Sequence, residues 1–384
     1  MLKILNIIDL LSPKIGGAEE RTYQMCRYLR LAGVEVDILT TKHLLDKEAI
    51  AKLPPGNIHC LKAVNFRFLF PLGARKWLEQ NISNYDALHI SKNWTMLSYI
   101  AGSVAAERQI PYAFSTMGFA SIHNRSKFLK RLYRKHASIP LIQRASACIS
   151  VTNEEKDDLI AAGASPDHIH VIPNGIISDH FLHKDDRHFR DAHQLGERKI
   201  ILFIGRMDPI KGVHLIIEAF AENRARLKEW LLVLVGTRTA YRQEMQVKAA
   251  QLGLHDDIIF LDPLFGKEKS EAYHAAEFIV IPSIKDAMTI IAPEAACCGK
   301  PVLITQSCDF SELAKFGGAM EVEPTVGGLA RGLVLLTNDS CDRAAMGRRG
   351  QDFVMSQFKW EQVALKYRGL FQAIAHQPGQ PLHS

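Results

Sequence analysis

Short apolar runs alternate with longer helical patterns along the whole chain, and this alternation restarts once near the middle. Near-continuous apolar strands separated by helices are typical of a parallel sheet that is covered on both faces. The strands expected in the first half are Lys3–Ile8, Val34–Thr40, Ala87–Ile90, Tyr112–Ser115 and Ala147–Val151. Those expected in the second half are Ile200–Ile204, Leu231–Gly236, Ile258–Leu261, Phe278–Ile281 and Pro301–Ile304. The pattern predicts an α/β protein with two Rossmann-like, doubly wound parallel-sheet domains.

The length of 384 residues suits two domains that each bury a core. We expect an N-terminal domain over residues 1–178, a linker over residues 179–198 and a C-terminal domain over residues 199–355. The linker is expected because that segment is polar, rich in charge and His, and without periodicity. Residues 356–384 are expected to form a last helix, Glu361–Ala375, and a tail.

The net charge of +6 is unevenly placed along the chain. Residues 1–180 contain 22 Lys and Arg against 16 Asp and Glu, whereas residues 181–384 contain 25 of each kind. The longest stretch without a carboxylate, from Arg108 to Asn153, holds eight basic residues. A nucleic-acid-binding protein is more often basic throughout, with interleaved aromatic residues. The asymmetry therefore argues against nucleic acid and favours two domains with different partners.

The cysteines and the N-terminus indicate the compartment. The seven cysteines form no Cys-x-x-Cys pair and have no zinc-finger spacing to His, so we expect free thiols. Asp9 interrupts the apolar N-terminus, which is interpreted as a strand rather than a signal peptide. No apolar run reaches the roughly 18 residues that a membrane span needs. We expect a cytoplasmic protein, at most peripheral on the cytoplasmic face of the inner membrane.

Two loops that follow expected strands carry residues suited to phosphate. Gly16 and Gly17 lead into a helix whose free N–H groups can bind an anion, although such a pair is as often only a tight turn. Arg206 and Lys211 follow the first strand of the second half, where a guanidinium and an ammonium suit a diphosphate. The alternative for these two cations is surface charge on a loop.

A third loop carries two carboxylates. Asp286 follows an apolar strand, and Glu294 stands eight residues later in the first turn of a helix, where Pro293 also fits. Two carboxylates that face one cleft would accept hydrogen bonds from the hydroxyls of a sugar or a ribose. Such a pair also arises by chance, so the spacing alone is a modest signal.

Taken in order, these segments resemble the retaining glycosyltransferase family 4, which has the GT-B fold. The matching motifs are Gly16-Gly17-Ala18-Glu19, Val171-Ile172-Pro173-Asn174-Gly175, Gly205-Arg206 with Lys211-Gly212, and Asp286 with Glu294 in the Glu-x7-Glu segment. The resemblance covers nearly the whole chain. It implies two Rossmann-like domains facing across a cleft, the C-terminal one binding a nucleotide-sugar and the N-terminal one the acceptor. It also implies that the last helix, within residues 356–384, crosses back to the N-terminal domain.

The resemblance also implies roles for individual residues. Arg206 and Lys211 would hold the diphosphate and stabilise the departing nucleotide. Glu294 would accept the ribose hydroxyls and Asp286 those of the donor sugar, which makes Arg206, Lys211 and Asp286 the catalytic set. Further donor contacts would come from Gly16, Gly17, Gly205, Thr289 and Ile290. Members retain the anomeric configuration by front-face attack and need no metal, so we expect no cofactor, with a UDP- or GDP-sugar as substrate.

Two departures from the family pattern bear on donor choice. Asp286 replaces the first Glu of the motif, and Ala287, Met288 and Thr289 replace its small neighbours. Met117 stands where the family often has a His that touches the donor sugar. His123 lies nearby but is interpreted as a surface residue.

The acid-free stretch contains a basic amphipathic pattern over residues 124–144. Its apolar face comprises Phe128, Leu129, Leu132 and Tyr133, and its basic face comprises Lys127, Lys130, Arg131, Arg134 and Lys135. Such a helix can lie on an anionic membrane, which would suit a lipid-linked or lipopolysaccharide acceptor. The alternative is a helix packed on the core whose solvated face happens to be basic.

We expect a hexosyltransferase that builds a glycan or glycolipid, in cell-surface polysaccharide or lipopolysaccharide synthesis. A nucleotide-sugar 2-epimerase shares the architecture but usually lacks the Arg206, Lys211 and Glu-x7-Glu set. A non-catalytic subunit that binds sugar nucleotides would agree with the altered residues at 117 and 286–289. A dehydrogenase is excluded because Gly-x-Gly-x-x-Gly is missing.

Overall fold

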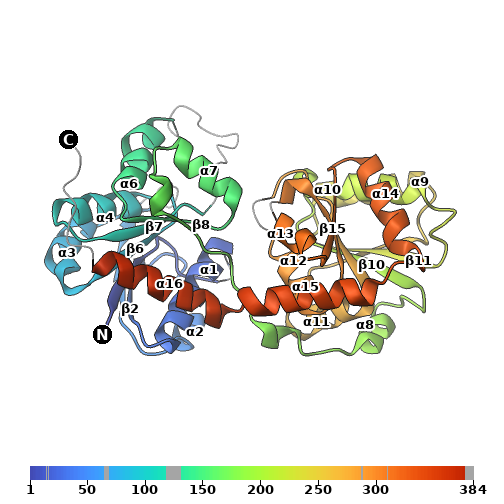
Figure 1. Ribbon diagram of the computed structural model, residues 1–384, viewed down its shortest axis with the longest axis horizontal. Helices are drawn as coiled ribbons and strands as arrows, with labels where there is room; N and C mark the ends of the chain where they lie inside the picture. The colour runs from blue at the N-terminus through green and yellow to red at the C-terminus, as the bar shows by residue number, and fades with distance from the viewer. Residues whose placement is uncertain are drawn as a thin grey trace. The chain divides into compact units, whose positions relative to one another are not determined.

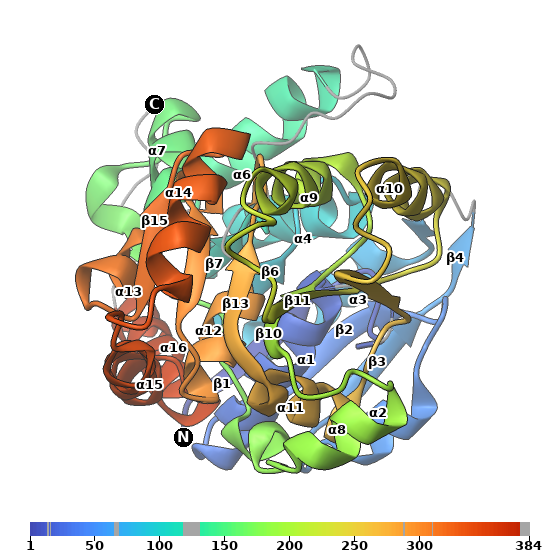
Figure 2. The same cartoon turned by 90° about the vertical axis from the view of Figure 1, so that its right-hand side faces the viewer.

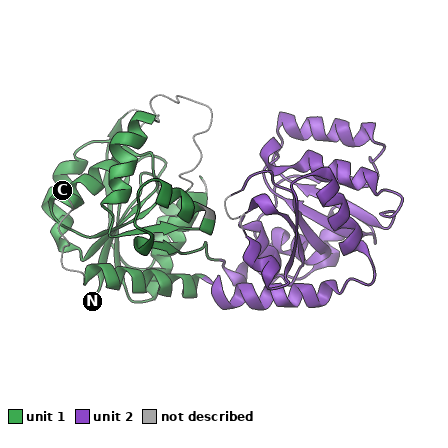
Figure 3. Ribbon diagram, turned by 45° about the horizontal axis from the view of Figure 1, so that its top comes forward, with its two compact units in different colours: residues 1–175, 360–384 green, residues 176–359 purple. Residues whose placement is uncertain are grey.

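The chain forms two α/β units, each built on its own parallel sheet (Figure 3). The computed structural model describes residues 1–13, 15, 17–64, 69–117, 131–286, 289–308 and 310–376. Unit 1 comprises residues 1–175 and 360–384, and unit 2 comprises residues 176–359. The chain therefore passes between the units at residues 175/176 and again at 359/360.

The sheet of unit 1 has the strand order β3-β2-β1-β6-β7-β8-β9, and every neighbouring pair is parallel. Its strands are β1 (Lys3–Ile7), β2 (Glu35–Thr41), β3 (Ile58–Leu61), β6 (Ala87–Ser91), β7 (Tyr112–Ser115), β8 (Ala147–Ser150) and β9 (Ile169–Val171). A separate antiparallel pair joins β4 (Ala63–Val64) and β5 (Phe70–Pro71). The five expected strands are confirmed. The edge strands β3 and β9 were not expected, because they are short and only partly buried.

Helices cover both faces of this sheet (Figure 1). They are α1 (Gly17–Leu31), α2 (Lys47–Ala51), α3 (Ala74–Asn81), α4 (Met96–Glu107), α6 (Ile139–Gln143), α7 (Asn153–Ala161) and α16 (Trp360–Ala375). The pair α1 and α16 packs on one face, and α3, α4 and α6 pack together on the other. The Arg21 guanidinium of α1 donates hydrogen bonds to the Tyr367 hydroxyl of α16 (2.7 Å) and to the Ile172 carbonyl (2.9 Å). The last helix is thereby part of unit 1.

The sheet of unit 2 has the order β12-β11-β10-β13-β14-β15 and is parallel throughout. Its strands are β10 (Lys199–Ile204), β11 (Trp230–Val235), β12 (Ile258–Leu261), β13 (Ala276–Ile281), β14 (Val302–Thr305) and β15 (Ala319–Val322). The five expected strands are confirmed, and the half-buried edge strand β15 is additional.

The sheet of unit 2 is also covered on both faces, as Figure 2 shows. Helices α9 (Val213–Glu222), α10 (Ala240–Gln251) and α14 (Val326–Thr337) lie along one face. Helices α8 (Asp186–Ala192), α11 (Gly266–Ala275), α12 (Ile291–Cys297) and α15 (Arg343–Gln357) lie toward the other, and the short α13 (Ser311–Lys315) precedes β15.

The expectation of an irregular linker over residues 179–198 is wrong. These residues belong to unit 2 and contain the end of a 3-10 helix, Ser178–Phe181, and the helix α8. Phe189 is fully buried in α8, which packs on α11, and Arg190 donates a hydrogen bond to the Ala275 carbonyl (3.2 Å). A two-turn helix anchored by a single apolar residue has no periodicity that a sequence pattern can reveal.

A buried histidine in β6 connects the sheet of unit 1 to α16. His89 is fully buried, with Nδ1 2.8 Å from Asn6 Oδ1 and Nε2 2.8 Å from Ser115 Oγ. Its ring lies against Tyr367 and Phe371 of α16, with centroids 5.9 and 5.8 Å apart. Burial, with a smaller contribution from the Arg21 charge, lowers the pKa of His89 from 6.5 to about 3.

This shift predicts that His89 destabilises unit 1 in acid. In the unfolded chain His89 is protonated below about pH 6.5, whereas in the folded protein it stays neutral down to about pH 3. Stability is therefore lost as the pH falls from 6.5 toward 3. In His89→Gln one titrating group is removed, so the free energy of unfolding should depend less steeply on pH. The slope should be smaller than that of the wild type by about 1.4 kcal/mol per pH unit. Urea unfolding of both proteins between about pH 4 and 7 measures the slopes. Identical slopes would contradict the neutral buried state.

Candidate functional site

The strand order of unit 2 reverses between β10 and β13, which are neighbours at the centre of the sheet. Open α/β sheets bind ligands outside the carboxyl ends of their strands at such a point. Residues 205–212 follow β10 there, and residues 282–286 follow β13. The two loops are held together because the Ile284 N–H donates to the Ile210 carbonyl (2.8 Å). The fold thus gathers the cations and the first carboxylate of the sequence prediction at one edge.

Gly212 permits the close approach of these loops. It has φ +67°, in the left-handed region, and a Cβ at this position would lie 1.9 Å from the Pro282 carbonyl oxygen. Backbone cannot yield to such a contact, so only glycine combines this conformation with this proximity.

Lys211 and Asp286 form an ion pair across the two loops. Lys211 Nζ lies 2.5 Å from Asp286 Oδ2, and about one sixth of each side chain is exposed (17% and 16%). The Asp286 N–H donates to the Ser307 carbonyl (2.9 Å), which ties this loop to the segment after β14. The sequence analysis assigned the diphosphate to Lys211 and the sugar hydroxyls to Asp286, whereas the structure pairs the two residues with each other. An ammonium has three donors, so Lys211 can keep Asp286 and still reach an anion.

Arg206 lies at the same edge of the sheet. Its side chain is exposed, and it makes no hydrogen bond or ion pair with the residues that the structure describes. Gly205 before it donates its N–H to the Val235 carbonyl (3.0 Å), which continues the β10–β11 pairing to the start of the loop. The backbone before Arg206 is therefore anchored, while its side chain is exposed.

Glu294 occupies a different environment on α12. It is 7% exposed, and Lys269 Nζ lies 2.7 Å from each of its carboxylate oxygens. The buried Tyr273 hydroxyl donates to Oε2 at 2.7 Å. Just before α12, Thr289 is buried and its hydroxyl accepts from the Ile291 N–H (3.3 Å), whereas Ile290 is exposed.

Sequence reasoning missed Lys269 and Tyr273. Both lie on α11, more than twenty residues before Glu294, and none of the four matching motifs includes them. Their spacing of four residues would place them on one face of a helix, which was the available signal. No sequence pattern says which carboxylate that face meets.

In unit 1 the strand order reverses between β1 and β6, next to the start of α1. Gly17 is the first residue of α1, and a Cβ there would meet nothing within 4 Å, whereas Gly16 lies outside the described residues. Lys92, directly after β6, places Nζ 3.1 Å from Asp9 Oδ1 and 2.6 Å from Glu19 Oε1. Burial opposes the charge of Lys92, but the two carboxylates outweigh it and raise its pKa. Lys92 was not singled out from the sequence.

Non-glycine residues with left-handed backbone stand in the loops at this edge. Lys92 has φ 82°, Trp94 has φ 63°, and Met117, after β7, has φ 49°. Such conformations cost free energy and concentrate at functional sites. Met117 is half-buried at the position where the family often has His.

Part of the basic segment is described. Lys127, Lys130, Phe128, Leu129 and His123 lie outside the described residues, as do Ala287 and Met288 of the third loop. Arg131 and Lys135 are exposed, and Arg134 is half-buried at the start of a π-helix, Arg134–Ser138. Tyr133 packs inward, where its hydroxyl donates to the Thr95 carbonyl (2.7 Å), while Leu132 is 48% exposed. Contact of this segment with a membrane stays a prediction.

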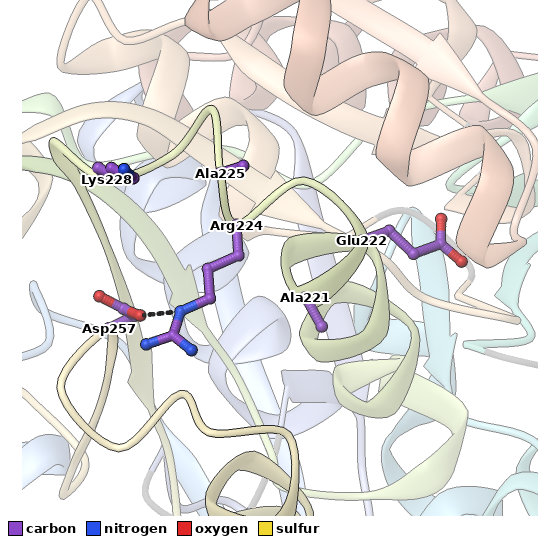
Figure 4. A pocket seen from close by; sticks show the side chains of 6 residues that line it. All are labelled: Ala221, Glu222, Arg224, Ala225, Lys228 and Asp257. Atoms are coloured by element: carbon purple, nitrogen blue, oxygen red, sulfur yellow. Dashed lines mark hydrogen bonds and ion pairs between the residues drawn. The ribbon is translucent and has the colours of Figure 1, made fainter.

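A pocket of about 560 Å³ lies elsewhere on unit 2 (Figure 4). It is lined by Ala221, Glu222, Arg224, Ala225, Lys228 and Asp257, and Arg224 Nε pairs with Asp257 Oδ2 at 3.0 Å. These residues precede β11 and β12, so the pocket opens at the amino ends of the strands, the edge opposite Lys211. It is not part of the candidate site.

The described part of the chain shows neither a metal-ion site nor a helix that could span a membrane. It contains no group of three or more His, Cys, Asp or Glu side chains arranged to hold a metal ion. None of the helices described is both long and apolar enough to cross a bilayer.

Comparisons with known proteins agree with this architecture. A family model described as "Glycosyltransferase Family 4" matches residues 15–180, and one described as "Glycosyl transferases group 1" matches residues 185–353. A D-inositol 3-phosphate glycosyltransferase of Xylanimonas cellulosilytica is 27% identical over 316 residues, which cover 75% of each chain.

Two solved structures show the same fold. A glycosyltransferase from Rickettsia africae ESF-5 matches with a TM-score of 0.80 at 18% identity, covering 98% of this chain and 99% of that one. Anabaena Alr3699/HepE, solved in complex with UDP and glucose, matches with a TM-score of 0.76 at 18% identity, covering 97% of this chain and all of that one.

The contact between Gly212 and Pro282 predicts a specific cost of substitution. Gly212→Ala should lower the free energy of unfolding by clearly more than Gly266→Ala, because the loops must separate. Gly266 also has a left-handed φ (+53°), but a Cβ there meets nothing within 4 Å, so its variant should lose only about 1 kcal/mol. Urea unfolding of both variants measures the losses, and equal losses would show that the loops part at no cost.

Proposed function

We propose that this chain, which belongs to the family 4-like glycosyltransferases with the GT-B fold, transfers a sugar from a nucleotide-sugar to a glycan or glycolipid with retention of anomeric configuration. One observation carries the proposal: Lys211 is paired with Asp286 where the strand order of unit 2 reverses, and the exposed Arg206 lies in the same loop as Lys211. Two cations and a carboxylate at this edge suit a diphosphate joined to a sugar.

Arg206 and Lys211 would stabilise the negative charge that develops during the reaction. Charge builds on the diphosphate as the bond to the sugar breaks, and donors held in place beforehand stabilise it without reorganisation. Asp286 holds the Lys211 ammonium at the loop, and Arg206 adds a forked donor. We therefore assign neutralisation of the leaving group to these side chains, with no metal cofactor, and propose a UDP- or GDP-sugar as donor.

The remaining predicted contacts complete the donor site. Asp286 would accept hydrogen bonds from the donor sugar, Glu294 from the ribose, and Gly205, Thr289 and Ile290 would line the path between them. Gly16 and Gly17 are proposed as further donor contacts. The 2-epimerase and non-catalytic alternatives are disfavoured because both family models are glycosyltransferase models that together cover most of the chain.

The acceptor is proposed to be anionic or membrane-bound. All of the surplus positive charge lies in residues 1–180, and the described basic residues Arg131 and Lys135 are exposed. We propose a lipid-linked or lipopolysaccharide-type acceptor and peripheral attachment to the cytoplasmic face of the inner membrane.

Turnover tests the assignment of Lys211. Lys211→Ala should lower release of nucleoside diphosphate from the donor at least about a hundredfold, as is usual when a preorganised donor is removed. Lys228→Ala is the matched control, since Lys228 is an exposed lysine of the same unit at the opposite edge. It should turn over like the wild type. Near-normal turnover of Lys211→Ala in a folded protein would refute the assignment.

Sedimentation with vesicles tests the membrane proposal. Each basic residue near an anionic surface contributes about 1 kcal/mol, so Arg131→Gln with Lys135→Gln should weaken binding by about 30-fold at low salt. Lys228→Gln with Arg348→Gln removes the same charge from unit 2 and should have little effect. If the wild type does not pellet with anionic vesicles at low salt, the proposal fails.

A further inference from the structure

The carboxylate of Glu294 is held from one side by two residues of α11. Lys269 Nζ lies 2.7 Å from both carboxylate oxygens, and the Tyr273 hydroxyl donates to Oε2 at 2.7 Å. Lys269 and Tyr273 are four residues apart, so they project from the same face of the helix. The carboxylate is therefore fixed in position by two independent donors.

Helix α11 is itself firmly anchored. Tyr273 is fully buried and its ring packs edge-on against Phe181, with centroids 5.7 Å apart. The Ser270 hydroxyl donates to the His183 carbonyl (2.7 Å). The position of Glu294 is thus set by a helix that cannot shift without disturbing the core of unit 2.

These two donors leave part of the acceptor capacity of Glu294 unused. A carboxylate offers about four acceptor positions, and Lys269 and Tyr273 occupy at most three of them. Lys269 is the more accessible of the two donors, with 23% of its side chain exposed, whereas Tyr273 is fully buried, so the open side of the carboxylate is the side of Lys269. A hydroxyl entering from that side can donate to the remaining position and accept from the ammonium.

We propose that Lys269 and Tyr273 are positioning residues that hold Glu294 to receive the ribose of the nucleotide donor, so that they determine the preference for ribose over deoxyribose. This inference rests on the proposed function, because it assigns Glu294 to that ribose. An ion pair that only stabilised the fold would affect ribo- and deoxyribonucleotides alike.

Calorimetric binding of UDP, GDP and their 2′-deoxy forms to the full-length protein tests the proposal without donor sugar or acceptor. The wild type should bind one ribonucleotide at least about tenfold more tightly than its 2′-deoxy form, as expected for a hydrogen bond to a charged group. Lys269→Met and Tyr273→Phe should weaken ribonucleotide binding and reduce this preference to about twofold. Their affinity for the 2′-deoxy form should stay within about twofold of the wild type.

Three further variants separate positioning from fold stability. Lys269→Arg keeps a donor and should recover part of the preference. Lys267→Met is the matched control, because Lys267 lies on the same helix but pairs with Glu271 (3.2 Å). It should keep the wild-type preference. In a Glu294→Gln background, Lys269→Met should change the preference no further, because Lys269 acts through Glu294.

The outcomes are distinct. If the wild type binds neither UDP nor GDP, the proposed donor class fails. The wild type can instead bind UDP or GDP with a preference for the 2′-hydroxyl. If Lys269→Met and Tyr273→Phe then keep that preference, or weaken the binding of ribo- and deoxyribonucleotides equally, the positioning role is overturned while the proposed function stands.

Discussion

The parallel pairing of β10 with β13 is the contact on which the candidate site depends. These two strands are far apart in sequence, and their pairing brings the loops after them to one edge. Gly212 then permits the loops to touch, and the ion pair of Lys211 with Asp286 spans them. A carboxylate and two cations from the two loops therefore lie at one edge of the sheet, which is the arrangement on which the proposed stabilisation of a leaving group rests.

Unit 1 has a comparable arrangement at its own reversal of strand order. Lys92 is held between Asp9 and Glu19, and its backbone, like that of Trp94 and Met117, is left-handed. The two units thus share a topology but differ in the charge at the point where the strand order reverses. In unit 2 the side chain of Arg206 is exposed, whereas in unit 1 the charge of Lys92 is balanced by two carboxylates.

Much of the fold was predictable because its signals are local. The apolar run Tyr112–Ser115 has the bounds found in the structure, since a fully covered parallel strand must be apolar along its length. The edge strand Ala319–Val322 and the helix Asp186–Ala192 were not predictable in the same way. Each is stabilised by a few contacts with distant segments, and such contacts leave no periodic pattern.

The residues of the site show the same difference between local signals and contacts with distant segments. Motif and spacing identify the chemical groups, namely the cations Arg206 and Lys211 and the carboxylates Asp286 and Glu294, because both are properties of the chain. The partners of these groups could be found only in the packed structure. It joined Lys211 to Asp286 and placed Lys269 and Tyr273 on Glu294. Ion pairs and buried hydrogen bonds depend on distances between segments that lie apart in the chain, and those distances exist only once the sheets and helices have packed.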